Sequence, residues 1–253
     1  MARQLLKWLN RVLNAAIILA ILAAMAYSLY SIWDNNSIYA AALSVSNRIR
    51  KEKPTGDKPS FDDLLKINPD VCAWITLDGT NIDYPIVQGS SNDEYLNKDV
   101  YGEYSLAGSI FLDTRCSRGF TDFDELVYGH HMDRHEMFGD LDLYLDEDFF
   151  NQNETGTLLL PGQKIPVTVV AVMVADDTDP WVFDPAAADE NPARYLSYIA
   201  SNAKYVHSET LMAVGSDTGS QHLLTLSTCS SDQEDDRTVV IASYQISKAE
   251  GNE

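Results

Sequence analysis

The longest apolar stretch of the chain lies close to its N-terminus. From Val12 to Trp33 the sequence carries no charged residue, and Asn14 is the only strongly polar one. About 20 apolar residues in a helix that rises 1.5 Å per residue are enough to cross a hydrocarbon core of roughly 30 Å. We therefore predict a transmembrane helix in a first segment, residues 1–33.

The charges on either side of this stretch predict its orientation. Asp34 is the first charge after the stretch, whereas three cations precede it: Arg3, Lys7 and Arg11. Cations favour the cytoplasmic side, so the chain after Trp33 is expected outside the cell. The alternative is a cleaved signal peptide, because Ala24-Met25-Ala26 fits a small-residue cleavage site. The apolar run continues well beyond that site, which favours a retained anchor, and both alternatives export the rest of the chain.

A weaker apolar stripe follows the predicted anchor. In residues Asn35 to Lys53 the apolar positions recur at helical spacing and form one stripe. Pro54 and Pro59 then end the pattern. We predict a helical stalk and linker over residues 34–60, followed by an extracellular domain over residues 61–253.

The pattern in the exported domain changes from helical to β. A short helix is expected over Phe61 to Ile67, and further helical patches over Met137 to Leu145 and Asn191 to Tyr205. Short runs rich in β-branched and aromatic residues, separated by turn residues, are Val71–Leu77, Ile82–Val87, Ser109–Leu112, Glu125–Tyr128, Thr157–Leu160, Val167–Val174, His222–Ser227 and Thr238–Ile246. This spacing predicts a mainly β domain, a closed or nearly closed barrel with peripheral helices. The segment Asp176 to Pro185 shows no regular pattern, and its aromatic residues either line a groove or pack back onto the domain.

Charge and cysteine content argue against nucleic-acid binding, a disulfide framework and a cysteine metal site. The formal net charge is -20, with 38 acidic residues against 18 lysines and arginines, whereas a protein that binds nucleic acid needs clustered cations. The three cysteines, Cys72, Cys116 and Cys229, are widely separated and odd in number, which is neither a disulfide framework nor a metal-binding spacing. The sequence leaves open whether Cys72 and Cys116 pair.

A candidate nucleophile follows an apolar strand in Thr225-Leu226-Ser227-Thr228-Cys229-Ser230. A cysteine at a strand end lies at the rim of a barrel, where a substrate can reach it. The thiolate is the reactive form, so Cys229 would need a base or a cationic neighbour. The alternative is a buried, inert cysteine.

A candidate acid/base lies at a second strand end, in Leu126-Val127-Tyr128-Gly129-His130-His131-Met132. Histidine is suited to exchange protons near neutral pH. The alternatives are solvent-facing turn histidines, or a zinc site formed by His131 and His135. No HExxH motif and no nearby third ligand support zinc.

A candidate cationic partner opens the last strand, in Asp236-Arg237-Thr238. If this strand pairs with the strand of Cys229, the guanidinium lies beside the thiol and can stabilise a thiolate or an oxyanion. The alternative is a salt bridge to Glu234, Asp235 or Asp236. The acidic loop between Cys229 and Arg237 would raise the thiol pKa unless the arginine offsets it.

Together these motifs resemble those of the sortases, cysteine transpeptidases of Gram-positive cell surfaces. The resemblance rests on YGHHM, LSTC and the later arginine, and it extends through Trp74 to Gln88, Asn92 to Asn97 and Gly108 to Asp113. Together with the helix that precedes the cysteine strand, these segments are similar to class B sortases.

The resemblance implies an eight-stranded β-barrel and a mechanism without metal or organic cofactor. Cys229 would attack the carbonyl of a threonine in a C-terminal sorting signal of the Pro-x-Thr type, such as Asn-Pro-x-Thr, forming a thioacyl enzyme. His130 would move the protons and Arg237 would bind substrate and oxyanion. The acceptor would be an amine of a peptidoglycan precursor or of a pilin. The alternatives are a pilin polymerase, a cysteine hydrolase, and a membrane-tethered binding domain without catalysis.

The resemblance also implies a set of substrate-binding residues. These are Asn92, Leu96, Ser227, Thr228 and Trp181. The loop that contains Trp181 departs from the family pattern, so the peptide specificity stays open.

Overall fold

The computed structural model describes residues 1–229 and 236–246, with only the backbone given for Ala2 and Cys229. The chain divides into two compact units, Met1–Ala41 and Ala42–Glu253. The predicted anchor and stalk helices form one continuous helix, α1 (Ala2–Ile49), followed by a single turn, η1 (Arg50–Glu52). In its apolar part α1 has a mean hydropathy of 2.2 and no buried residues, so its length and composition are compatible with a membrane anchor.

The end of α1 belongs to the second unit. Ala42, Ser46 and Ile49 are buried there, and their spacing of four and three residues places them on one face of the helix. The basic residues that follow are used inside the unit. Arg48 stacks on the ring of Tyr101, 3.3 Å from its centroid, and Lys53 binds Asp83 at 2.6 Å. The second unit therefore begins inside the segment predicted as stalk and linker, residues 34–60.

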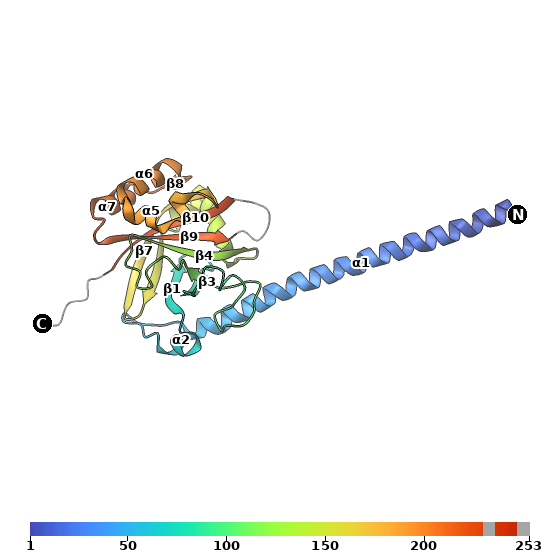
Figure 1. The fold of residues 1–253 in the computed structure, drawn as a ribbon, viewed down its shortest axis with the longest axis horizontal. Helices are drawn as coiled ribbons and strands as arrows, with labels where there is room; N and C mark the ends of the chain where they lie inside the picture. Colours follow the sequence, from blue (N-terminus) through green and yellow to red (C-terminus); the bar gives the residue numbers. More distant parts are fainter. Residues whose placement is uncertain (230–235, 247–253) are drawn as a thin grey trace. The chain divides into compact units, whose positions relative to one another are not determined.

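The second unit is a closed β-barrel (Figure 1). Its strands are β1 (Val71–Leu77), β2 (Asp83–Val87), β3 (Ile110–Leu112), β4 (Asp124–Met132), β6 (Thr155–Leu160), β7 (Gln163–Asp176), β9 (Gln221–Cys229) and β10 (Asp236–Gln245). They follow the order β10-β9-β4-β3-β2-β1-β6-β7, and a pairing of β7 with β10 closes the ring. Two short strands add to it: β5 (Glu136–Met137) pairs with β4, and β8 (Tyr205–Val206) pairs with β7. Eight strands in a closed ring confirm the predicted fold class.

Helices cover the barrel from outside. They are α2 (Asp62–Ile67), η2 (Gly139–Leu145), α3 (Glu147–Gln152), α4 (Pro180–Phe183), α5 (Pro185–Glu190), α6 (Pro192–Asn202) and α7 (Ser208–Ser216). Figure 1 shows α5, α6 and α7 gathered on one side of the barrel, and Tyr195, Ile199 and Val214 from these helices share a core with Val170 and Val239 of the strands. Because β9 is covered on both faces, it is buried without interruption from Leu223 to Thr228.

The strand positions agree with the sequence pattern, whereas some helices differ from it. The segment expected to be irregular contains α4, because the Asp179 side chain accepts a hydrogen bond from Trp181 N at 2.9 Å and caps a turn that begins with Pro180. The patch at Met137 to Leu145 is a 3-10 helix from Gly139 onward. The helix α7 was not predicted, and Leu211 and Val214 bury its apolar face.

The two cysteines whose pairing the sequence left open are both buried and free. The thiol of Cys72 donates to Ile86 O at 3.4 Å, whereas the sulfur of Cys116 accepts from Leu126 N at 3.3 Å. Each sulfur is thus held by a different part of the barrel.

Candidate active site

Strand pairing brings two of the three candidate catalytic residues opposite one another. Strands β4 and β9 run parallel, in a register that pairs Tyr128 with Ser227 and His130 with Cys229. Parallel strands end at the same rim of a barrel, so the acid/base candidate and the nucleophile candidate share that rim. Positions 130 and 229 are therefore neighbours in the sheet, although they are 99 residues apart in the sequence.

The third candidate, Arg237, lies at the same rim on β10, in a part of that strand that is no longer paired with β9. The β9–β10 ladder ends with the pair Ser227 and Val239. Beyond it β10 stays paired with β7, where Arg237 lies opposite Ala175. The rim is therefore split: Cys229 remains with β4, and Arg237 remains with β7.

The ring of His130 is held by the segment that connects β2 to β3. Its Nε2 lies 2.7 Å from the carbonyl oxygen of Leu96. A carbonyl oxygen only accepts, so Nε2 carries the hydrogen and Nδ1 is the nitrogen left to exchange a proton. Gly108, with φ +59°, is packed beside this contact, and a Cβ there would lie 2.6 Å from Leu96 O and 3.0 Å from His130 Cδ2. The candidate Leu96 thus contributes its backbone to the site.

The guanidinium of Arg237 is paired with a residue that the sequence did not indicate. Its Nη2 donates to Asp177 Oδ2 at 3.0 Å, and the two side chains are 18% and 36% exposed. The Nη1 atom is buried and has no hydrogen-bond partner within residues 1–229 and 236–246. Two of the carboxylates considered as alternatives, Glu234 and Asp235, lie outside the described residues, as does most of the acidic loop.

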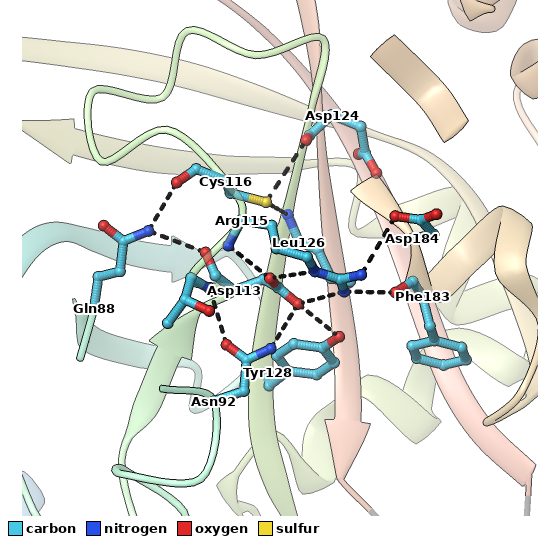
Figure 2. A network of polar contacts seen from close by, with 11 residues as sticks. Gln88, Asn92, Asp113, Arg115, Cys116, Asp124, Leu126, Tyr128, Phe183 and Asp184 are labelled. Carbon is cyan, nitrogen blue, oxygen red and sulfur yellow. Dashed lines mark hydrogen bonds and ion pairs between the residues drawn. The ribbon is translucent and has the colours of Figure 1, made fainter. Parts of the chain in front are cut away.

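The candidate Asn92 belongs to a network centred on a buried carboxylate (Figure 2). Asp113 is fully buried and accepts hydrogen bonds from Asn92 Nδ2 at 2.9 Å, Tyr128 Oη at 3.2 Å and Arg115 Nη2 at 2.8 Å. Burial alone would raise the pKa of Asp113, but the hydrogen bonds from Arg115 and Asn92 outweigh it and hold that pKa below its ordinary value. The network supports Tyr128, two residues before His130.

The same network also binds the end of α4 through Arg115. Arg115 donates to the carbonyl of Phe183 at 2.7 Å and to Asp184 at 3.3 Å (Figure 2). The Asn92 amide oxygen also accepts from Thr114 N at 2.8 Å. Both ends of this amide are thus bound within the domain.

The candidates Ser227 and Thr228 are buried, with 0% and 5% exposure. The Thr228 hydroxyl accepts a hydrogen bond from Thr238 N at 3.1 Å, across the split between β9 and β10. This placement suits residues that position the end of β9.

The candidate Trp181 packs back onto its own domain. Its ring stacks with Tyr198 at 6.0 Å between centroids, and the Arg194 guanidinium lies 4.8 Å from its centroid. Trp181 also borders a hollow of about 420 Å³, whose lining residues are Pro180, Trp181, Ala187, Glu190, Asn191 and Arg194. Both alternatives for this aromatic residue therefore hold in part, and a contact with a peptide stays a prediction.

The two histidines weighed as zinc ligands bind separate carboxylates. His131 Nε2 lies 2.7 Å from Asp142 Oδ2, and His135 Nδ1 lies 2.6 Å from Asp140 Oδ1. Within the part of the chain that the structure describes, no three potential ligands gather around one point.

Several residues of the rim carried no signal in the sequence. Asp142 and Asp177 are two of 38 acidic residues, and nothing in their local patterns distinguishes them. Gly108 lies in the segment Gly108 to Asp113, which supports the family resemblance, and this is the signal in the sequence that points to it.

Comparisons with known proteins agree with this geometry. A family model described as the sortase domain matches residues 75–245. Sortase B of Listeria monocytogenes is 30% identical over 204 residues, which are 79% of this chain and 77% of that protein. A solved class B sortase of Streptococcus pyogenes, involved in pilus biogenesis, is 37% identical, with a TM-score of 0.62 over 73% of this chain and 97% of that chain. Sortase B of Clostridium perfringens is 33% identical, with a TM-score of 0.65 over 73% of this chain and 99% of its own. The chain therefore belongs to the sortase family of cysteine transpeptidases, and within it to class B.

Proposed function

We propose that this chain cleaves a C-terminal sorting signal after threonine and joins the new carboxyl end to an amine, with Cys229 as nucleophile. The observation that carries the proposal is the register of β4 and β9, which sets His130 opposite Cys229 at one rim. Arg237, the second residue of β10, lies at the same rim and supplies the cation that cysteine chemistry needs.

The chemistry takes place in two acyl transfers. The Cys229 thiolate attacks the threonine carbonyl, a C–S bond forms, and the C–N bond of the scissile peptide breaks. His130 gives its proton to the leaving amine and later takes one from the incoming amine, which attacks the thioester and releases the Cys229 thiolate. Nδ1 is the nitrogen in this role, because Nε2 is engaged by Leu96 O.

Arg237 stabilises the charge that develops on the carbonyl oxygen. Its Nη2 is held by Asp177, and its Nη1 is buried without a partner in the described part of the chain. A preorganised donor that is desolvated acts more strongly on an oxyanion than one in water. Leu96 O holds the His130 ring, Asn92 belongs to the Asp113 network that also holds Tyr128, and Trp181 borders the hollow beside α4.

The cellular setting follows from α1. Anchored by this helix, with its N-terminus in the cytoplasm, the domain would work on the outer face of the membrane, where sorting-signal proteins and peptidoglycan precursors meet. Tethering both enzyme and substrate to one surface raises their effective concentration. A pilin lysine is the second candidate acceptor, favoured by the 37% identity to a class B sortase that is itself involved in pilus biogenesis.

The test uses the full chain in detergent and a panel of fluorogenic peptides with Pro-x-Thr motifs, with and without an added amine. Cys229→Ala and His130→Ala should abolish cleavage, whereas Cys72→Ala, which alters a buried cysteine of β1, should keep it. Mass spectrometry should find cleavage after threonine and, with amine, an amide product. Cleavage that persists in Cys229→Ala would refute the proposal.

A further inference from the structure

A chain of hydrogen bonds links three strands at the split rim. Asp142, on η2, binds His131 Nε2 through Oδ2 at 2.7 Å and accepts from Thr238 Oγ1 through Oδ1 at 2.6 Å. Thr238 N in turn donates to Thr228 Oγ1 at 3.1 Å. We call these four residues the rim network. It connects β4 to β10 through one carboxylate, and β10 to β9 through the Thr228 hydroxyl.

Each strand residue of the rim network is the chain neighbour of a candidate catalytic residue. His131 follows His130, Thr228 precedes Cys229, and Thr238 follows Arg237. A shift of one of these three neighbours therefore moves the catalytic residue next to it, because one peptide bond separates them.

The rim network lies where the backbone no longer holds the two halves of the site together. The β9–β10 ladder stops at Ser227 and Val239, and Thr228 and Thr238 do not form a backbone pair. The bond from Thr238 N to the Thr228 hydroxyl replaces the missing ladder step. A side-chain bond depends on the rotamer of its residue, so the separation of the two strands here needs further support.

Asp142 provides that support from outside the sheet. Its bond to Thr238 is short and charge-assisted, and the threonine is only 9% exposed. Its other oxygen holds the strand of His130. One carboxylate thus sets both the β10 side and the β4 side of the rim, with the end of β9 between them.

We infer that Asp142 is a positioning residue that sets the separation between the Cys229 strand and the Arg237 strand. The inference rests on the proposed function of Cys229, His130 and Arg237. Asp142 contacts no reacting atom itself, and it acts through the three neighbours of those residues.

The test compares Asp142→Ala and Asp142→Asn with Asp148→Ala, which alters an exposed aspartate of α3, in the full chain in detergent. Asp142→Ala should lower kcat about 10-fold, the effect of losing one hydrogen bond to a charged group, with KM within about twofold. Asp142→Asn should recover most of kcat, since an amide still accepts from Thr238. Asp148→Ala should match the wild type in both constants.

Two further measurements separate positioning from general stability. Thr238→Val removes the hydroxyl and keeps the shape, so the double variant with Asp142→Ala should lose little more kcat than Asp142→Ala alone. The rate of Cys229 alkylation by iodoacetamide needs no peptide, and it should fall at least about threefold in Asp142→Ala because Arg237 moves away from the thiol. Burial raises the pKa of Cys72 to about 12, so that thiol does not compete.

The outcomes distinguish this inference from the proposed function. Unchanged kcat and unchanged alkylation in Asp142→Ala would overturn the inference while Cys229-dependent cleavage by the wild type stands. Fully additive losses in the double variant would also overturn it. A wild type that cleaves no peptide would refute the proposed function, and the alkylation rates would still decide the role of Asp142.

Discussion

Gly108 provides a test of how the site holds His130. Its backbone has φ +59°, and a Cβ at this position would lie 2.6 Å from both Leu96 O and Tyr95 O. Leu96 O is the acceptor for His130 Nε2, so Gly108→Ala would push on the atom that orients the ring. Gly102 is a matched control in the same connection, because it has φ +83° and its Cβ would meet nothing closer than Lys98 Cε at 3.7 Å.

The magnitudes of the two substitutions follow from these contacts. A left-handed conformation costs an alanine about 1–2 kcal/mol, and this is the whole expected loss for Gly102→Ala. Gly108→Ala adds an overpacking cost of about 1–3 kcal/mol, because the Cβ meets backbone oxygens that cannot rotate away. The expected destabilisation is therefore about 2–5 kcal/mol, which a typical domain survives. A displacement of His130 by about 1 Å would lower kcat about 100-fold.

The assay combines urea unfolding with peptide cleavage at a temperature where both variants remain folded. Gly102→Ala should keep the wild-type kcat, whereas Gly108→Ala should lose most of it. Equal losses of activity in the two variants would refute the reasoning, because the backbone strain is common to both and only the contacts with Leu96 and His130 differ.

Three further predictions concern charged residues of the site. Asp113→Ala should lower the free energy of unfolding by about 3 kcal/mol, because it removes a fully buried acceptor shared by Asn92, Tyr128 and Arg115; a loss below about 1 kcal/mol in urea unfolding would contradict this. Asp177→Ala should lower kcat/KM about 10-fold with little change in Tm, since an ion pair this exposed adds little stability but orients Arg237; unchanged kcat/KM would count against that orientation. The hydrogen bond to Asp142 raises the pKa of His131 above its ordinary value of 6.5, so the pair stabilises the fold below that pH and loses its contribution as the pH rises through the raised value. Unfolding at about pH 5.5 and about pH 8.5 should therefore differ more in the wild type than in His131→Gln, and equal differences would argue against the pairing.

The sequence pattern predicted the strands of the barrel more accurately than its helices. A strand such as Val71–Leu77 has the same bounds in the pattern and in the structure, because β-branched and aromatic side chains favour an extended backbone locally. The helix α7 was missed, since its apolar face becomes evident only when Leu211 and Val214 pack into the core. The pattern around Trp181 predicts no regular element, because the four-residue helix α4 depends on a single side-chain cap from Asp179.

The candidate site shows the same division. Cys229, His130 and Arg237 stand out because each lies at a strand end in a recognisable motif. The residues that hold them do not: Asp142 is 96 residues from Thr238, and Asp177 is 60 residues from Arg237. No local pattern relates positions so far apart.

The amino-acid sequence by itself determined the apolar N-terminal helix, the β character of the domain, and which residue types are available for cysteine chemistry. These properties depend on hydrophobicity, backbone propensity and side-chain chemistry, which each residue carries with it. The tertiary structure alone decided that β9 and β10 separate at the rim, that Gly108 lies against His130, and that Asp142 joins β4 to β10. Such contacts arise when the barrel closes, because closure brings distant strands to a register that no single segment specifies.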